Sequence, residues 1–148
     1  MSSDVPRRSG VRSPRVLVSD RQAVPLPGPL VASLGEVAAA TLAAEGSEGV
    51  ELSLSFVDVA EMAELHQRYL GEGGPTDVLA FPLGEDGLLG DVIVCPEVAA
   101  GNNPDRDAEL RLLVVHGTLH LLGFDHEGDG ERALMWMKQE AYSGIRAP

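Results

Sequence analysis

Three of the four histidines in the 148-residue sequence lie close together, at His116, His120 and His126. The spacing predicts that His116 and His120 share one face of a helix, because residues four apart lie one turn from each other. Gly123 is expected to end that helix with a positive φ, so that the chain turns and His126 returns as a third ligand. Three neutral imidazoles suit zinc or a similar transition metal and leave a fourth position open, as catalytic sites do.

Two other interpretations of these histidines are less favourable. A lone histidine on so apolar a helix is more often a hydrogen-bonded core residue, but three at this spacing favour metal binding. The pattern H-x-x-x-H-x-x-G-x-x-H is also that of metzincin proteases, in which a glutamate follows the first histidine and acts as general base. Here that position is Gly117, which argues against a peptidase. Nickel or iron would accept the same ligands as zinc.

The elements that must position these residues are interleaved strands and helices. Strands are predicted over 15–19, 50–57, 78–81 and 88–95, and helices over 29–45, 58–70, 105–122 and 129–143. Asp58, Asp105 or Asp107, and Asp129 are candidate N-caps for the last three helices. Strands and helices do not alternate strictly, which predicts an α+β fold with a mixed sheet packed with helices. The three-histidine metal site would lie at the end of a buried helix.

Length and composition predict one domain. Residues 1–14 are rich in Ser, Arg and Pro and are expected to form a flexible leader, and residues 15–148 a single domain. The single cysteine, Cys95, excludes an intrachain disulfide framework and a zinc site with two cysteine ligands. We see no secretory signal and no apolar run of the length needed to span a membrane. These features predict a cytoplasmic protein with no membrane partner.

The net charge of −12 is unevenly distributed. Residues 1–21 carry five arginines and two acidic residues, whereas the remainder carries six basic and 21 acidic residues. Affinity for phosphate backbones comes from Lys and Arg, so this acidic body is a poor nonspecific binder of nucleic acid.

Three sequence blocks carry a resemblance to a known family. HGTLHLLGFDH (116–126) resembles the signature of the YbeY family of bacterial endoribonucleases, which take part in ribosomal RNA maturation and ribosome quality control. GPTDVLAFPL (74–83) and LLGDVIVCPE (88–97) resemble the second and third blocks of that family, in the same order and at fitting spacing. The resemblance extends over roughly 50–141.

This resemblance implies an α+β fold with one zinc ion held by His116, His120 and His126. It implies a metal-dependent endoribonuclease that cleaves single-stranded RNA, with ribosomal RNA as substrate and no DNA. Small-subunit ribosomal proteins or an assembly GTPase are candidate partners. A non-catalytic, metal-stabilised ribosome-assembly factor is the alternative, because an acidic surface suits basic ribosomal proteins.

Further candidate site residues accompany the histidines. Many family members carry an arginine directly after an aromatic residue, and this arginine is thought to handle the RNA phosphate. Here Leu70 follows Tyr69, so Arg68 is the candidate cation, and Arg68 and His116 are the predicted catalytic residues. Asp91 and Asp125 are candidates for orienting a ligand histidine from outside the metal's coordination shell.

Overall fold

The computed structural model describes residues 13–85, 87–124 and 128–144. The elements follow one another as β1 (Arg15–Asp20), α1 (Gly28–Ala44), β2 (Glu51–Phe56), α2 (Val59–Leu70), β3 (Val78–Glu85), β4 (Leu88–Val94), α3 (Pro96–Asn102), α4 (Arg106–Leu121) and α5 (Asp129–Ser143). The predicted leader falls almost wholly in residues 1–12, which lie outside the described residues. No described helix is long and apolar enough to cross a bilayer.

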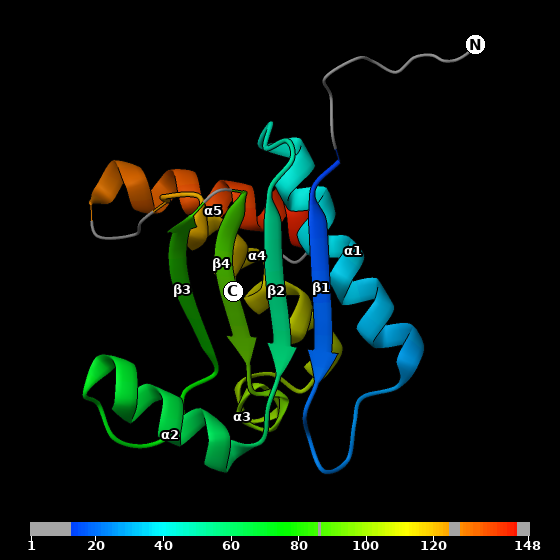
Figure 1. The fold of residues 1–148 in the computed structure, drawn as a ribbon, viewed down its shortest axis with the longest axis vertical. Helices are drawn as coiled ribbons and strands as arrows, with labels where there is room; N and C mark the ends of the chain where they lie inside the picture. Colours follow the sequence, from blue (N-terminus) through cyan, green and yellow to red (C-terminus); the bar gives the residue numbers. More distant parts are fainter. Residues whose placement is uncertain (1–12, 86, 125–127, 145–148) are drawn as a thin grey trace.

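The strands form one mixed sheet in the order β1-β2-β4-β3 (Figure 1). β1 pairs parallel to β2 and β2 parallel to β4, whereas β3 and β4 form an antiparallel hairpin. The parallel pairs need long crossover connections: α1 connects β1 to β2, and α2 together with β3 connects β2 to β4. The predicted α+β class with a mixed sheet is confirmed.

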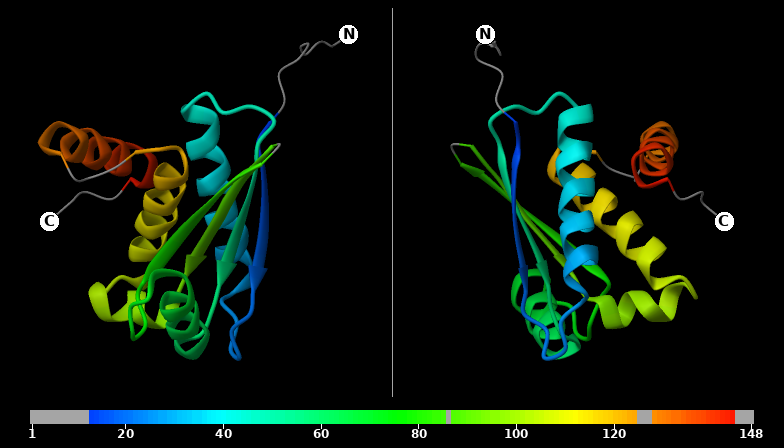
Figure 2. Two further views of the ribbon diagram at one scale, coloured as in Figure 1. Left: turned by 60° about the vertical axis from the view of Figure 1, so that its left-hand side comes forward. Right: turned by 90° about the vertical axis from the view of Figure 1, so that its right-hand side faces the viewer.

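Helices α1, α4 and α5 lie on one side of the sheet, while α2 lies at one end of it (Figure 2). α4 packs between the sheet and α5, and it also contacts α1 and α3. Most of its side chains are buried on this account, including Leu110, Val114 and Leu119. The buried helix that the sequence predicts around the histidines is therefore present.

The main core forms between the sheet and the helices on that side. The alternation in β2 predicted one buried face, and Leu52, Leu54 and Phe56 are all fully buried. They pack with residues of α1, β4 and α4 in one cluster. A smaller cluster lies beneath α2 and includes Met62 and Ile93, on the other face of β4.

The helix starts agree only in part with the predicted caps. Asp105 caps α4, because its Oδ1 accepts a hydrogen bond from the Ala108 N–H at 3.1 Å. Asp58 occupies the predicted N-cap position of α2, but its side chain makes no cap bond and instead accepts a hydrogen bond from the Ala23 N–H at 2.9 Å. Asp129 is wrong as a cap, since Gly128 occupies that position and Asp129 is already helical. The seven-residue α3 was not predicted, because so short a segment shows no clear periodicity.

Gly90 allows β3 and β4 to pair closely next to α4. It has φ of +152°, and a Cβ there would lie 2.3 Å from the Phe81 carbonyl oxygen and 2.9 Å from Leu121 Cδ2. The backbone oxygen cannot move without breaking the hairpin. This position therefore excludes any side chain.

We predict that Gly90→Ala lowers the free energy of unfolding by at least about 2 kcal/mol, from steric overlap and backbone strain combined. Gly101→Ala is the matched control, because a Cβ at Gly101 in α3 meets nothing within 4 Å. Urea unfolding followed by circular dichroism measures both. Equal stability of the two variants would contradict the account of the hairpin.

Candidate metal and catalytic site

His116 and His120 lie one turn apart on α4, both half-buried. Their ring centroids are 4.7 Å apart and the rings meet edge to face at 64°. The prediction that the two imidazoles share one face of a helix is confirmed. Val115 and Leu119, each one position before a histidine, are fully buried beside the two rings.

A hollow of about 190 Å³ opens beside the two histidines. Its walls come from three elements, namely α4, β3 and the last residue of α2. The lining residues are Leu70, Val78, Leu79, Ala80, His116, Gly117 and His120. Apart from the imidazoles, the side chains that line the hollow are apolar.

Gly117 brings α4 close to the sheet at this point. A Cβ at Gly117 would lie 2.6 Å from Val92 Cγ1, which is closer than real side chains approach. No side chain fits, so the general-base glutamate of metzincins has no room here. The absence of a glutamate at position 117, which argues against a peptidase, thus has a steric cause.

Gln139 on α5 orients His116. The His116 Nδ1 and Gln139 Oε1 are 2.5 Å apart, and Gln139 is only 4% exposed. The amide oxygen accepts, so the neutral imidazole carries its proton on Nδ1 and its lone pair on Nε2. Gln139 is not among the site residues predicted from the sequence. The available signal was a polar residue four positions after Met135, on the apolar face of the last helix.

Helix α5 is held against α1 by a three-residue cluster. Lys138 Nζ lies 2.7 Å from Glu45 Oε2, and the Tyr142 hydroxyl donates to the same oxygen. Lys138 Nζ also lies 5.1 Å above the Phe124 ring. Because Glu45 follows the end of α1, these contacts fix the placement of α5 and with it Gln139.

Arg68 does not reach the hollow. Its guanidinium pairs with Glu64 one turn earlier on α2, at 3.1 Å, and its side chain is 56% exposed. Leu70, two residues later, is the residue that lines the hollow. Residues two apart on a helix point to nearly opposite sides, so Arg68 cannot substitute at the position of Leu70 without rebuilding the end of α2.

The structure places Asp91 away from His116 and His120, and its role in orienting a ligand histidine stays a prediction. Side chains alternate along β4, and its neighbour Val92 contacts α4 at Gly117. Asp91 therefore points to the opposite face of the sheet. There it lines a surface hollow with Arg21, Ser53 and other residues of β1 and β2.

His126 and Asp125 lie outside the described residues. Among the residues that the structure does describe, no group of three or more His, Cys, Asp or Glu side chains is placed to hold a metal ion. The structure thus brings together His116 and His120. The third ligand remains a prediction.

Comparison with known proteins assigns the chain to a family. The family model described as endoribonuclease YbeY matches residues 29–144. The chain belongs to the YbeY family. This match runs from the start of α1 to the end of α5 and includes His116, His120 and Gln139.

Individual YbeY proteins agree with this assignment. The endoribonuclease YbeY of Beutenbergia cavernae is 46% identical over 106 residues, covering 61% of this chain and 71% of that protein. The Micrococcus luteus protein of the same description is 45% identical over 107 residues, covering 63% and 68%. The solution structure of a Thermotoga maritima protein is similar, with a TM-score of 0.62, 33% identity and 86% of each chain covered.

The contacts of Glu45 predict a pH dependence of stability. Burial raises the pKa of Glu45, but hydrogen bonds from Lys138 and Tyr142 outweigh it and leave the pKa below its ordinary value. Such a carboxylate stabilises the fold above its unfolded pKa, and this contribution is lost as the pH falls through the folded pKa. We predict that Glu45→Gln costs about 1 kcal/mol at neutral pH.

Urea midpoints measured between neutral pH and about pH 3 test this prediction. The loss of stability below about pH 5 should be shallower in Glu45→Gln than in the wild type. Glu48→Gln, which changes an exposed carboxylate three residues away, should keep the wild-type slope. Identical slopes for all three proteins would show that Glu45 does not stabilise the contact between α1 and α5.

Proposed function

We propose that this YbeY protein is a metal-dependent endoribonuclease that cleaves single-stranded RNA and acts on ribosomal RNA in maturation and ribosome quality control. The observation that carries the proposal is the pair of imidazoles one turn apart on α4, with Gln139 holding the Nδ1 of His116. The family's own description, endoribonuclease, supplies the reaction class.

His116, His120 and His126 are the residues that would hold the metal, and zinc is the ion we favour. The donor set fits, because neutral imidazoles suit zinc and a metal-bound histidine usually donates its other N–H to an acceptor, as His116 does to Gln139. When bound, the ion supplies a Lewis acid for the phosphodiester and lowers the pKa of water.

The chain's own residues prepare the site for this chemistry. Gln139 fixes the ring plane and tautomer of His116. Leu70, Val78 and Ala80 give the hollow an apolar wall beside the two imidazoles. None of the described residues that line this hollow is Lys or Arg, so we leave Arg68 out of the proposed catalytic set.

The second candidate function is a metal-stabilised ribosome-assembly factor without nuclease activity. One observation in its favour is the apolar wall of the hollow beside His116 and His120, where Leu70 occupies the position at which many family members carry arginine. The other is the net charge of −12. An acidic chain of this kind suits basic small-subunit ribosomal proteins, or an assembly GTPase that carries a basic surface.

A cleavage assay on a ribosomal RNA fragment with an unpaired end tests the proposal. We expect cleavage by zinc-loaded protein, loss after chelation and return when zinc is restored. His116→Ala should lower the rate by more than about 100-fold, because one ligand is lost. Arg68→Ala should cleave close to the wild-type rate, because Arg68 lies on the exposed side of α2.

Variants of Gln139 separate orientation of His116 from ligation. Gln139→Leu should need about 10- to 100-fold more zinc for half-maximal cleavage, whereas Gln139→Glu keeps an acceptor and should need about as much as the wild type. A second outcome is that zinc-loaded protein that is folded cleaves no RNA but binds small-subunit ribosomal proteins. In that case the assembly-factor function replaces the nuclease function as our proposal. Cleavage that survives both chelation and His116→Ala would contradict a site on α4.

A further inference from the structure

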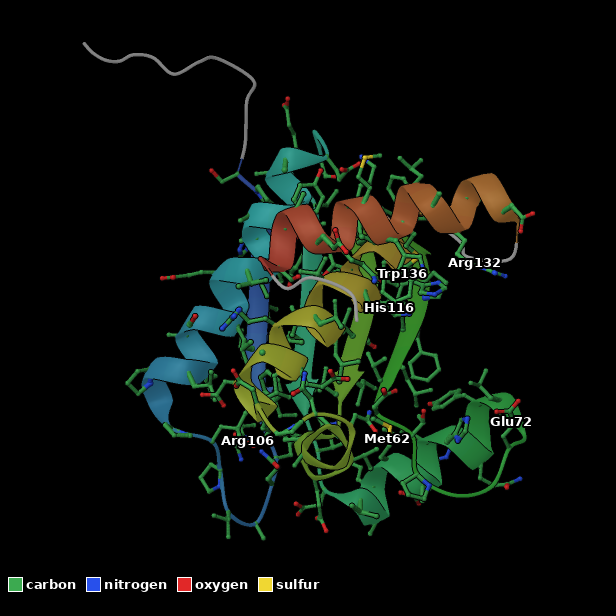
Figure 3. The ribbon with its side chains drawn as sticks, turned by 180° about the vertical axis from the view of Figure 1, so that it is seen from behind. Met62, Glu72, Arg106, His116, Arg132 and Trp136 are labelled. Atoms are coloured by element: carbon green, nitrogen blue, oxygen red, sulfur yellow. The ribbon has the colours of Figure 1, made fainter. Side chains whose placement is uncertain are left out.

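A second cavity opens on the other side of His116, between α4 and α5. It has a volume of about 250 Å³ and is lined by His116, Arg132, Met135, Trp136 and Gln139. We call it the α5 cavity. The four α5 residues are spaced i, i+3, i+4 and i+7, so one face of this helix forms the wall. Figure 3 shows Trp136 and Arg132 near His116, beneath α5.

Trp136 is unusual in its exposure. It is the single tryptophan of a sequence with only 4% aromatic residues, and it is 42% exposed. The core around α5 is built from Val115, Leu119 and Met135 without it. A large aromatic ring that lines a cavity without filling the core is suited to bind a ligand.

We propose that the α5 cavity is a subsite for one unpaired nucleobase of a single-stranded nucleic acid, which stacks on the Trp136 ring. The inference rests on the proposed function, because it places this base next to the phosphodiester at His116. Bases stack on aromatic side chains irrespective of sequence, since every base has a π-face.

The size and chemistry of the cavity suit a nucleobase. Pockets for drug-sized ligands begin at about 300 Å³, so this smaller cavity fits a single heteroaromatic ring system rather than a peptide segment. Met135 supplies an apolar floor, and the Arg132 guanidinium is a planar group of the kind that also stacks on bases. His116 lies at the border of the α5 cavity and the hollow beside His120.

The subsite also explains how an acidic protein could bind RNA and prefer single strands. With a net charge of −12, the chain as a whole gains little from nonspecific phosphate contacts, so contacts that do not depend on charge would add to its affinity for RNA. Base stacking is such a contact. In a duplex the faces of each base are covered by its neighbours, so only an unpaired base can enter the cavity.

Intrinsic fluorescence tests the subsite without any cleavage, because all tryptophan emission comes from Trp136. The probes are a short single-stranded oligoribonucleotide and an abasic strand of the same length and sugar, added to metal-free protein. We expect the base-bearing strand to quench the emission and the abasic strand to leave it unchanged. Quenching by neither strand, or by both equally, would overturn the proposal.

Fluorescence anisotropy of the labelled oligoribonucleotide, measured with metal-free protein, extends the test to variants. Trp136→Ala should weaken binding by about 5- to 150-fold, the range that corresponds to about 1–3 kcal/mol per stacked base. Trp136→Phe should retain most of the wild-type affinity, because the phenyl ring can still stack on a base. Met137→Ala is the matched control, since Met137 is the next residue of α5, is 63% exposed and does not line the cavity. Equal weakening by Trp136→Ala and Met137→Ala would overturn the subsite.

The two proposals fail in different ways. Quenching by the base-bearing strand without RNA cleavage would leave a nucleotide-binding site on a protein that is not a nuclease. RNA cleavage without base-dependent quenching would keep the nuclease and remove the α5 cavity from its substrate site.

Discussion

The hydrogen bond between His116 and Gln139 joins the two parts of the molecule on which the site depends. α4 is pressed against the sheet so closely that Gly117 has no room for a Cβ beside Val92. An imidazole on such a helix needs a polar partner, because an unsatisfied buried nitrogen costs about 1–3 kcal/mol. Gln139 provides that partner from α5 at 2.5 Å, and in doing so it selects the tautomer that a metal ligand requires.

Helix α5 therefore has a role beyond covering the core. It is fixed to the end of α1 through Glu45, Lys138 and Tyr142. The same face that carries Gln139 carries Trp136 one turn earlier. One helix thus orients the ligand histidine and carries the aromatic ring on which we propose that a substrate base stacks. The distance between these two groups is therefore set by the helix itself.

Local patterns in the sequence were sufficient for much of this architecture. The alternation in β2, the spacing of His116 and His120 and the cap at Asp105 are each set by neighbouring residues, and each is confirmed. What could not be predicted depends on contacts between distant segments. The partner of His116 lies 23 positions away on another helix.

The positions of Arg68 and Asp91 in the structure show the same limit. Arg68 and Leu70 are close in sequence, but only the direction of the α2 axis relative to β3 decides which one lines the hollow. Asp91 follows a glycine in an apolar strand, and only the packing of α4 on Val92 shows that Asp91 faces the opposite side of the sheet.

Nitrogen-15 NMR of the histidine rings tests the central claim most directly, because ring nitrogen shifts report the tautomer of each imidazole. Spectra of metal-free protein at neutral pH should show His116 protonated on Nδ1, and added zinc should shift its Nε2 resonance while the Nδ1 proton remains. Gln139→Leu should abolish the preference for this tautomer in the metal-free state. A His116 ring protonated on Nε2 in the wild type, or one whose shifts do not respond to zinc, would contradict the account.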